Sequence, residues 1–251
     1  SIVEAKRILD GTNFNCAGGA TPWNTWLSCE EIARGTVWEC DPFGVKAAEP
    51  RPAMGKFAHE AVAVDEKGTS LYLTEDHPTG GLYRFTPTAW PDLSAGDLEV
   101  MTESATGVAW EAVPDPSGDS GDLNLQVPGT KAFAGGEGIT FNQGKIYFTT
   151  KYDGKVWCYD TTTNSLTTVY DPTGNPEPVL NGVDNVTSTE RGDLYVAEDG
   201  HKMQIVMLSG TRVDPVVQIT GVEGSEVCGP AFSPDGTRFY FSSQRNPGTT
   251  Y

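Results

Sequence analysis

The stretch Asn142-Gln143-Gly144-Lys145-Ile146-Tyr147-Phe148-Thr149-Thr150-Lys151 decides the fold class, because it joins a turn to a strand pattern. Asn142 and Gly144 favour a tight turn, and the aromatic and β-branched residues that follow favour a short β-strand. A similar apolar and aromatic run, Val156–Tyr159, comes about ten residues after the first run. The stretch therefore predicts two short strands joined by a turn.

The same strand pattern occurs five times along the chain, each time around an aromatic residue. These anchor residues are Trp26, Tyr72, Tyr147, Tyr195 and Tyr240. Their spacings are 46, 75, 48 and 45 residues, and three of the four match the ~40–50-residue period of propeller blades. The long spacing exceeds one period by about 29 residues. We therefore expect residues 89–133 to be an insertion or an atypical blade segment.

These repeats predict an all-β fold, a single β-propeller domain over residues 1–251 with five clear blades and room for a sixth. The 29 Gly and 17 Pro residues agree with many short strands and tight turns, and they exclude a coiled coil or a helical bundle. The last blade is short of strands, and Glu4–Leu9 is expected to pair with it as an outer strand. Closure by this N-terminal strand would protect the sheet edges.

The chain is strongly acidic, with 34 Asp and Glu against 17 Lys and Arg and a net charge of −17. This balance argues against nucleic acid and anionic membranes as partners, because both repel a negative surface. Excess carboxylates suit divalent cations, although a solvated acidic surface explains the charge equally well. No apolar run approaches the ~18 residues of a membrane span. We expect a monomer that acts on a small molecule.

Polar residues recur at two positions of the repeat, before and after the anchor. The earlier position holds Asn15, Glu60, Glu137, Asp184 and Glu226, and the later position holds Cys29, Glu75, Thr150, Glu198 and Ser243. In a propeller, equivalent positions of successive blades form rings around the central channel. Converging carboxylates repel each other, so the rings predict bound cations between them. The alternative is that these side chains accept hydrogen bonds from backbone amides at turns.

The segment Asn15–Glu31 resembles the signature of the PhoX-type alkaline phosphatases, which are secreted or periplasmic propeller enzymes. Further stretches similar to that family are Phe57–Ala61, Leu73–Asp76, Gly136–Gly138, Val183–Asn185 and Gly229–Gly236. The resemblance implies a short, divergent member with two irons and several calciums, and hence Ca²⁺ and Fe³⁺ as cofactors. It also implies a secreted or periplasmic location.

The resemblance implies a role for several residues of this chain. Iron or shared-metal positions are matched by Cys29, Glu75, Glu137 and Asp184, and calcium positions by Glu30, Glu60 and Glu198. Cys29, Glu137 and Lys151 are the implied catalytic residues. The family pattern has an Arg where this chain has Gly135 and a Lys where it has a residue near Thr21. Lys151 is the one evident basic substitute, so we expect weak binding of a dianionic phosphate.

The leading functional hypothesis is a metal-dependent phosphoesterase, similar to an alkaline phosphatase, that acts on a small phosphomonoester. Two alternatives stay open. One is another metal-dependent hydrolase such as a lactonase, and the other is a non-catalytic propeller that binds metal for structural reasons. Other enzyme classes lack their motifs, because the three His residues do not have zinc-ligand spacing and no serine-hydrolase elbow or phosphate loop is present.

Overall fold

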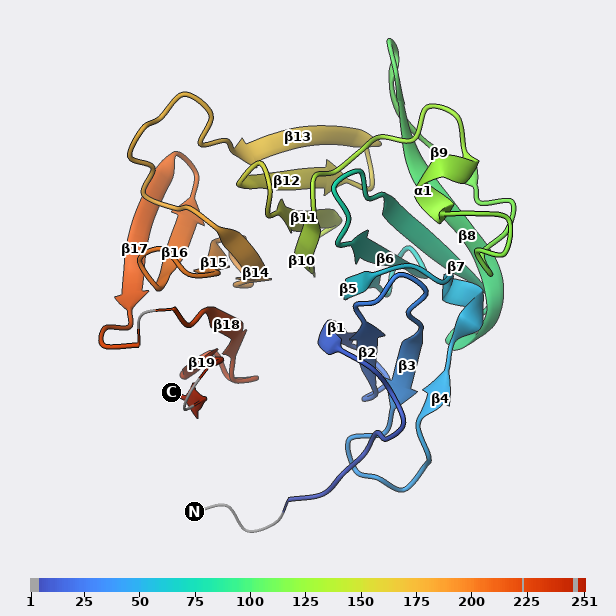
Figure 1. Cartoon of the computed structure of the whole chain (residues 1–251), viewed down its shortest axis with the longest axis horizontal. Coiled ribbons are helices and arrows are strands. Elements are labelled where there is room, and N and C mark those ends of the chain that lie inside the picture. The colour runs from blue at the N-terminus through green and yellow to red at the C-terminus, as the bar shows by residue number, and fades with distance from the viewer. Residues whose placement is uncertain (1–4, 223, 246–247) are drawn as a thin grey trace. The chain divides into compact units, whose positions relative to one another are not determined.

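The computed structural model describes residues 5–222, 224–245 and 248–251 (Figure 1). In these residues almost all regular structure is β-strand, apart from the 3₁₀ turn η1 (Pro52–Met54) and the one-turn helix α1 (Leu123–Gln126). No helix of the described residues has the length and apolar character that a bilayer span needs. The chain packs as two compact units, Ser1–Phe133 and Ala134–Tyr251.

The first unit holds two antiparallel sheets in which consecutive strands are neighbours. The first sheet consists of β1 (Asn15–Ala20), β2 (Trp26–Glu30), β3 (Val37–Cys40) and β4 (Glu49–Pro50). The second consists of β5 (His59–Asp65), β6 (Ser70–Glu75), β7 (Leu82–Ala89), β8 (Asp92–Ser104) and β9 (Gly107–Ala112). One continuous core joins them, because apolar residues of both sheets, such as Leu27 and Leu73, are fully buried in it.

Residues 89–133 extend the second sheet. Strands β8 and β9 form a long hairpin that projects from this sheet in Figure 1. The segment then returns through α1, and Phe133 forms a bridge with Gly80 beside the start of β7. Leu98 and Leu123 from this segment are buried in the core of the same unit. The segment therefore packs on the second sheet and contributes two of its five strands.

The second unit holds three more sheets, again with consecutive strands as neighbours. The first is β10 (Gly136–Asn142), β11 (Lys145–Thr150), β12 (Lys155–Asp160) and β13 (Ser165–Tyr170). The next is β14 (Val183–Ser188), β15 (Leu194–Glu198), β16 (Gln204–Ser209) and β17 (Arg212–Gln218). The last is β18 (Val227–Phe232), β19 (Phe239–Ser243) and β20 (Thr249–Thr250).

The predicted N-terminal strand Glu4–Leu9 is not found in the described residues. Residues 5–10 form no regular secondary structure, and Glu4 lies outside the described residues. Lys6 donates a hydrogen bond from its side chain to the carbonyl of Phe43, and Arg7 pairs with Asp10 at 3.1 Å. The segment thus makes side-chain contacts within its own unit where strand pairing was expected. That correction concerns the closing strand and leaves the five predicted sheets in place.

A β-bulge recurs in the first strand of every sheet. In the second sheet His59 pairs with Glu75 and Val62 pairs with Leu73, so three steps on one strand match two on the other. The same shift occurs in the four other first strands. A bulge bends its strand and redirects the side chains next to it. The repeat therefore places one side chain of each first strand in an equivalent position beside the bulge.

Candidate metal site

The register of the strand pairs shows which residues are equivalent in the five sheets. The residues that pair with the last residue of the second strand are Asn15, His59, Gly136, Val183 and Val227. The next residue of each strand is Cys16, Glu60, Glu137, Asp184 or Cys228; it begins the bulge in the first four sheets, whereas Cys228 still pairs with Ser242 and the bulge of the last sheet follows it. Of the residues predicted from the sequence, Glu60, Glu137 and Asp184 occupy this position, whereas Asn15 lies one residue and Glu226 two residues before it. A slip of one residue matters because neighbouring side chains of a strand point to opposite faces.

In the first unit, a thiol and two carboxylates gather at this position. The Cys16 sulfur and carboxylate oxygens of Glu31 and Glu60 all lie within 4.8 Å of one another. Two ligands on opposite sides of one cation are at most about 4–5 Å apart, since metal–ligand bonds are ~2.0–2.5 Å long. Glu60 is only 1% exposed. Its position at the bulge favours a cation, because a buried carboxylate needs a positive neighbour. The donor set therefore fits a metal ion.

Cys29, the predicted iron ligand, lies in a different environment. It is fully buried in β2, opposite Val37, and belongs to the apolar core of the first unit. Burial raises the pKa of the Cys29 thiol well above its usual value, and the Glu60 carboxylate raises it further. A metal ligand must be a thiolate. The role of Cys29 on iron stays a prediction, whereas Cys16 is the thiol whose sulfur lies within 4.8 Å of two carboxylate oxygens.

Sequence reasoning missed Cys16 and Glu31, although a signal for them was present. A residue with a small or polar side chain follows the bulge residue in every sheet, as in Cys16-Ala17, Glu60-Ala61 and Asp184-Asn185. Matching the five strands on this pair would have aligned Cys16 with Glu60. Matching on the aromatic anchor misplaced the first sheet by one residue, because Leu27, and not Trp26, is equivalent to Tyr72 in this register.

A further set of carboxylates lies at the end of the second strand of three sheets. Its members are Glu30, Glu75 and Glu198. Glu30 accepts hydrogen bonds from the backbone N–H groups of Asn13 at 2.9 Å and Thr36 at 3.0 Å. Glu75 and Glu198 have the same task in their own sheets, described below. These bonds tie loops to the sheet, which is the alternative that the sequence analysis left open.

The bonds of Glu75 and Glu198 are made inside the protein. Glu75 accepts from the backbone N–H of Gly81 and from the Tyr83 hydroxyl, each at 2.8 Å. Glu198 accepts from the backbone N–H of Asn181 at 2.9 Å and of Gln204 at 3.1 Å. Burial raises the pKa of both carboxyl groups, and these hydrogen bonds oppose that rise. A metal role for the set stays a prediction, since its oxygens already serve as acceptors for the loops.

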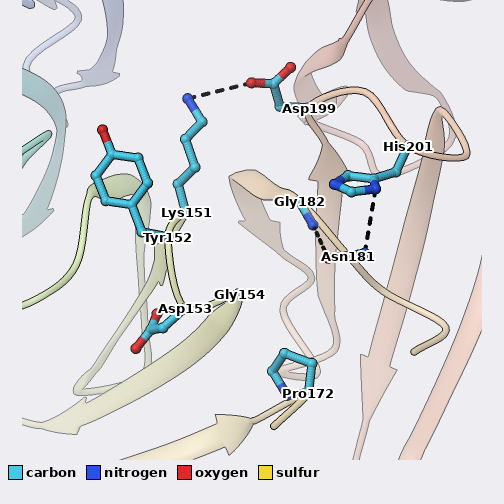
Figure 2. A pocket seen from close by; sticks show the side chains of 9 residues that line it. All are labelled: Lys151, Tyr152, Asp153, Gly154, Pro172, Asn181, Gly182, Asp199 and His201. Atoms are coloured by element: carbon cyan, nitrogen blue, oxygen red, sulfur yellow. Dashed lines mark hydrogen bonds and ion pairs between the residues drawn. The ribbon is translucent and has the colours of Figure 1, made fainter. Parts of the chain in front are cut away.

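In the second unit, Glu137 and Asp184 occupy the bulge position and each has a carboxylate oxygen within 4.8 Å of the other. Lys151 balances them, with its Nζ atom 2.9 Å from Glu137 Oε1 and 3.5 Å from Asp199 Oδ2 (Figure 2). Burial alone would lower the pKa of Lys151, but Glu137, Asp184 and Asp199 outweigh it and hold the pKa above its usual value. The acidic neighbours therefore favour the protonated form of Lys151.

A second cation, Arg245, lies at the other end of this acidic group. Its Nη2 atom is 3.0 Å from Glu226 Oε2. Burial raises the pKa of Glu226 to about 7, together with a hydrogen bond to Asp199 and the charges of Asp199 and Asp184, while Arg245 opposes the rise. Glu226 thus holds a proton more tightly than an ordinary glutamate does. Sequence reasoning found Lys151 and missed Arg245, which follows the end of β19 by two residues.

This chain has Gly135 and Thr21 at the two positions where the sequence analysis expected basic side chains from the family pattern. Gly135 has a φ of 72°, in the left-handed region where a side chain is strained. Its carbonyl accepts a hydrogen bond from the backbone N–H of Lys151 at 2.7 Å. Thr21 is nearly buried and bonds Thr25 through its hydroxyl group. Lys151 and Arg245 are the cations that contact the acidic group of the second unit in the described residues.

Comparisons with known proteins identify a family and several solved structures that are similar to this chain. The family model for alkaline phosphatase PhoX matches residues 4–178. No curated protein sequence matches the chain. Among solved structures, PhoX of Pseudomonas fluorescens in complex with vanadate, a transition-state analogue, superposes with a TM-score of 0.75 at 18% identity. That match covers 94% of this chain and 66% of PhoX, so the chain spans less than two thirds of the length of that structure.

Two further structures share the fold at lower similarity. A gluconolactonase of Xanthomonas campestris superposes with a TM-score of 0.57 at 12% identity, covering 89% of this chain and 67% of its own. A nidogen/laminin complex gives 0.55 at 12% identity, covering 87% and 70%. At this level of identity the likeness concerns the fold alone. The five sheets are the blades of a β-propeller, and the chain belongs to the alkaline phosphatase PhoX family.

Proposed function

We propose that this chain is a metal-dependent phosphomonoesterase. The observation that carries the proposal is the repeated bulge, which places Cys16, Glu60, Glu137 and Asp184 at one equivalent position of four blades. Membership of the PhoX family supports the same chemistry. We further propose that the ions are calcium and iron, with carboxylates for the hard cation and the Cys16 thiolate for the softer one.

Bound cations would supply the positive charge that stabilises the equatorial oxygens of a phosphoryl group during transfer. The residues of the chain have separate tasks in this scheme. Glu31 and Glu60 join Cys16 in holding metal in the first unit, and Glu137 joins Asp184 in the second. Lys151 stays protonated beside Glu137 and neutralises charge on the phosphoryl oxygens. It thereby replaces part of the basic character that Gly135 and Thr21 lack.

The substrate that we propose is a small phosphomonoester. Members of the PhoX family are periplasmic or secreted, and we propose the same location for this chain. A lactonase and a non-catalytic metal-binding propeller remain the competing hypotheses. The gluconolactonase shares only the fold, so it gives the lactonase hypothesis no support from the site.

The test combines metal analysis with an activity assay. Protein purified without chelator should contain calcium and iron and should hydrolyse p-nitrophenyl phosphate slowly. EDTA should abolish hydrolysis, and re-addition of both ions should restore it. Glu137→Gln should reduce hydrolysis about 10–100-fold, as expected when a group that holds or orients a metal ligand is lost. Glu177→Gln, an exposed carboxylate of the same unit, is the matched control and should change nothing.

The outcome separates the three hypotheses. Bound metal with hydrolysis of gluconolactone, but of no phosphomonoester, would favour the lactonase. Bound metal without either activity would favour the non-catalytic propeller. Absence of bound metal after purification and reconstitution would contradict all three.

A further inference from the structure

We infer that a pocket in the second unit binds the alcohol part of the substrate and selects small, uncharged, hydroxyl-bearing alcohols over anionic ones. The inference rests on the proposed function, because it names the substrate class of the same site. The pocket has a volume of about 340 Å³, and its walls include Lys151, Tyr152, Asp153, Asn181, Asp199 and His201 (Figure 2). This volume is near the lower end of the ~300–1,000 Å³ usual for ligand sites, so it suits a small alcohol.

Lys151 connects this pocket to the acidic group described above. Its Nζ atom lies 2.9 Å from Glu137 Oε1, while its side chain forms part of the pocket wall. Asp199 has the same double position, since it lines the pocket and lies 3.5 Å from Lys151 Nζ. A phosphoryl group held beside Glu137 would therefore place its ester oxygen and alcohol at the mouth of this pocket.

The wall offers groups that match hydroxyls. Asn181 presents a side-chain amide, with Oδ1 accepting from the Gly182 N–H at 3.0 Å and Nδ2 lying 3.4 Å from His201 Nδ1. Figure 2 shows the Asn181 and His201 side chains on one side of the pocket and Tyr152 on the other. Amide, imidazole and phenol groups each donate and accept, as a hydroxyl does. Such a wall suits a polyol better than an apolar leaving group.

The charge of the wall opposes an anionic alcohol. Asp153 and Asp199 both line the pocket. The charge of Lys151 is already shared by Glu137 and Asp199, and Lys155 lies 3.6 Å from Asp153. A carboxylate or second phosphate on the alcohol would meet these aspartates, while Lys151 serves the transferred phosphoryl group in the proposed function. Like charges a few ångströms apart repel each other near a protein surface.

Gly182 sets the width of the pocket. Its φ is +60°, and a Cβ atom added there would lie 2.4 Å from His201 Cδ2 and 2.8 Å from the Asp199 carbonyl. The preceding segment is anchored, because the Tyr170 hydroxyl donates to the Leu180 carbonyl at 2.7 Å. The backbone at Gly182 is therefore held close to His201. A methyl side chain at position 182 would have to displace the His201 imidazole.

The test compares two ligands that differ at one end. Non-hydrolysable phosphonate analogues of glycerol 3-phosphate and of 3-phosphoglycerate differ by a terminal hydroxymethyl group against a carboxylate. Titration calorimetry on metal-loaded protein should show the glycerol analogue binding at least tenfold tighter, a difference of about 1.4 kcal/mol. Asp153→Asn should reduce the ratio of the two affinities at least threefold, because it removes one negative charge from the pocket wall. Glu190→Gln, exposed and remote from the pocket wall, should leave the ratio unchanged.

A second variant covers the case in which Asp153→Asn does not fold. Gly182→Ala should weaken the glycerol analogue at least fivefold and leave inorganic phosphate binding unchanged, since phosphate alone does not enter the pocket. Equal affinity for the two analogues, no binding of either, or a ratio unaffected by Asp153→Asn would overturn the inference. Inorganic phosphate decides the proposed function separately, because its binding depends on the cations and not on this pocket.

Discussion

Glu60 and Glu75 lie on neighbouring strands of one sheet, and the structure uses their carboxylates differently. Glu75 accepts hydrogen bonds from Gly81 and Tyr83 and so holds the loop between β6 and β7. Glu60 stands one residue beyond the partner of Glu75, at the bulge, with Cys16 and Glu31 close to it. A buried carboxylate is thus structural where backbone donors reach it, and a ligand candidate where other ligand-type side chains gather around it.

The same comparison holds for the two cysteines of the first sheet. Cys16 lies at the bulge of β1 beside two carboxylates, whereas Cys29 is packed among apolar side chains in β2. Their sequence context is similar, since both belong to the segment that resembles the family signature. Substituting each cysteine in turn tests whether this difference in surroundings decides which thiol binds metal.

The largest effect is expected for Cys16→Ser. Loss of the thiolate should lower iron content and reduce phosphatase activity about 100-fold, since metal-site groups usually contribute 10–100-fold. Cys29→Ser should keep metal and activity within threefold, and it should lower the free energy of unfolding by about 1–3 kcal/mol by burying a hydroxyl. Elemental analysis and chemical denaturation measure both. The opposite pattern would return the iron ligand to Cys29.

An intermediate effect is expected for Glu198→Gln. Glu198 is fully buried and holds the N–H groups of Asn181 and Gln204, so an amide in its place would set a donor against a donor. The free energy of unfolding should fall by about 1–3 kcal/mol, while the calcium requirement for activity stays unchanged. A loss of calcium affinity that exceeds the loss of stability would show that Glu198 is a ligand, as the sequence analysis predicted.

The smallest effect is a pH dependence of stability in the metal-free protein. The pKa of Glu226 is raised to about 7, above its usual 4.5, by burial first and then by Asp199. The native state therefore holds this proton more tightly than the unfolded state. The stabilisation is complete below pH ~4.5 and is lost as the pH rises through about 7.

Glu226→Gln isolates this contribution. The melting temperature of the EDTA-treated wild type should fall relative to that of Glu226→Gln by a few degrees between pH 5 and pH 8. Burial lowers the pKa of His59 to about 4 and acts in the opposite direction, but it is present in both proteins and cancels in the difference. Parallel pH profiles of the two proteins would contradict the raised pKa of Glu226.

The sequence by itself determined the five-sheet repeat and the identity of Glu60, Glu137, Asp184 and Lys151 as residues of interest. These follow from local patterns, because strand periodicity and turn residues act over a few positions. The same local patterns also indicated that the last sheet has fewer strands than the others. The loop-holding task of the strand-end glutamates was recognised as an alternative, but the sequence could not decide between that task and metal binding.

Only the tertiary structure decided which thiol lies with the carboxylates. Cys16 and Cys29 differ in burial and in strand register, and register depends on a bulge that no residue type specifies uniquely. The same applies to Arg245, which follows β19 and meets Glu226 just before the paired strand β18. The physical reason is that one residue of register turns a side chain to the opposite face, so a small error along the chain becomes a different neighbourhood in space.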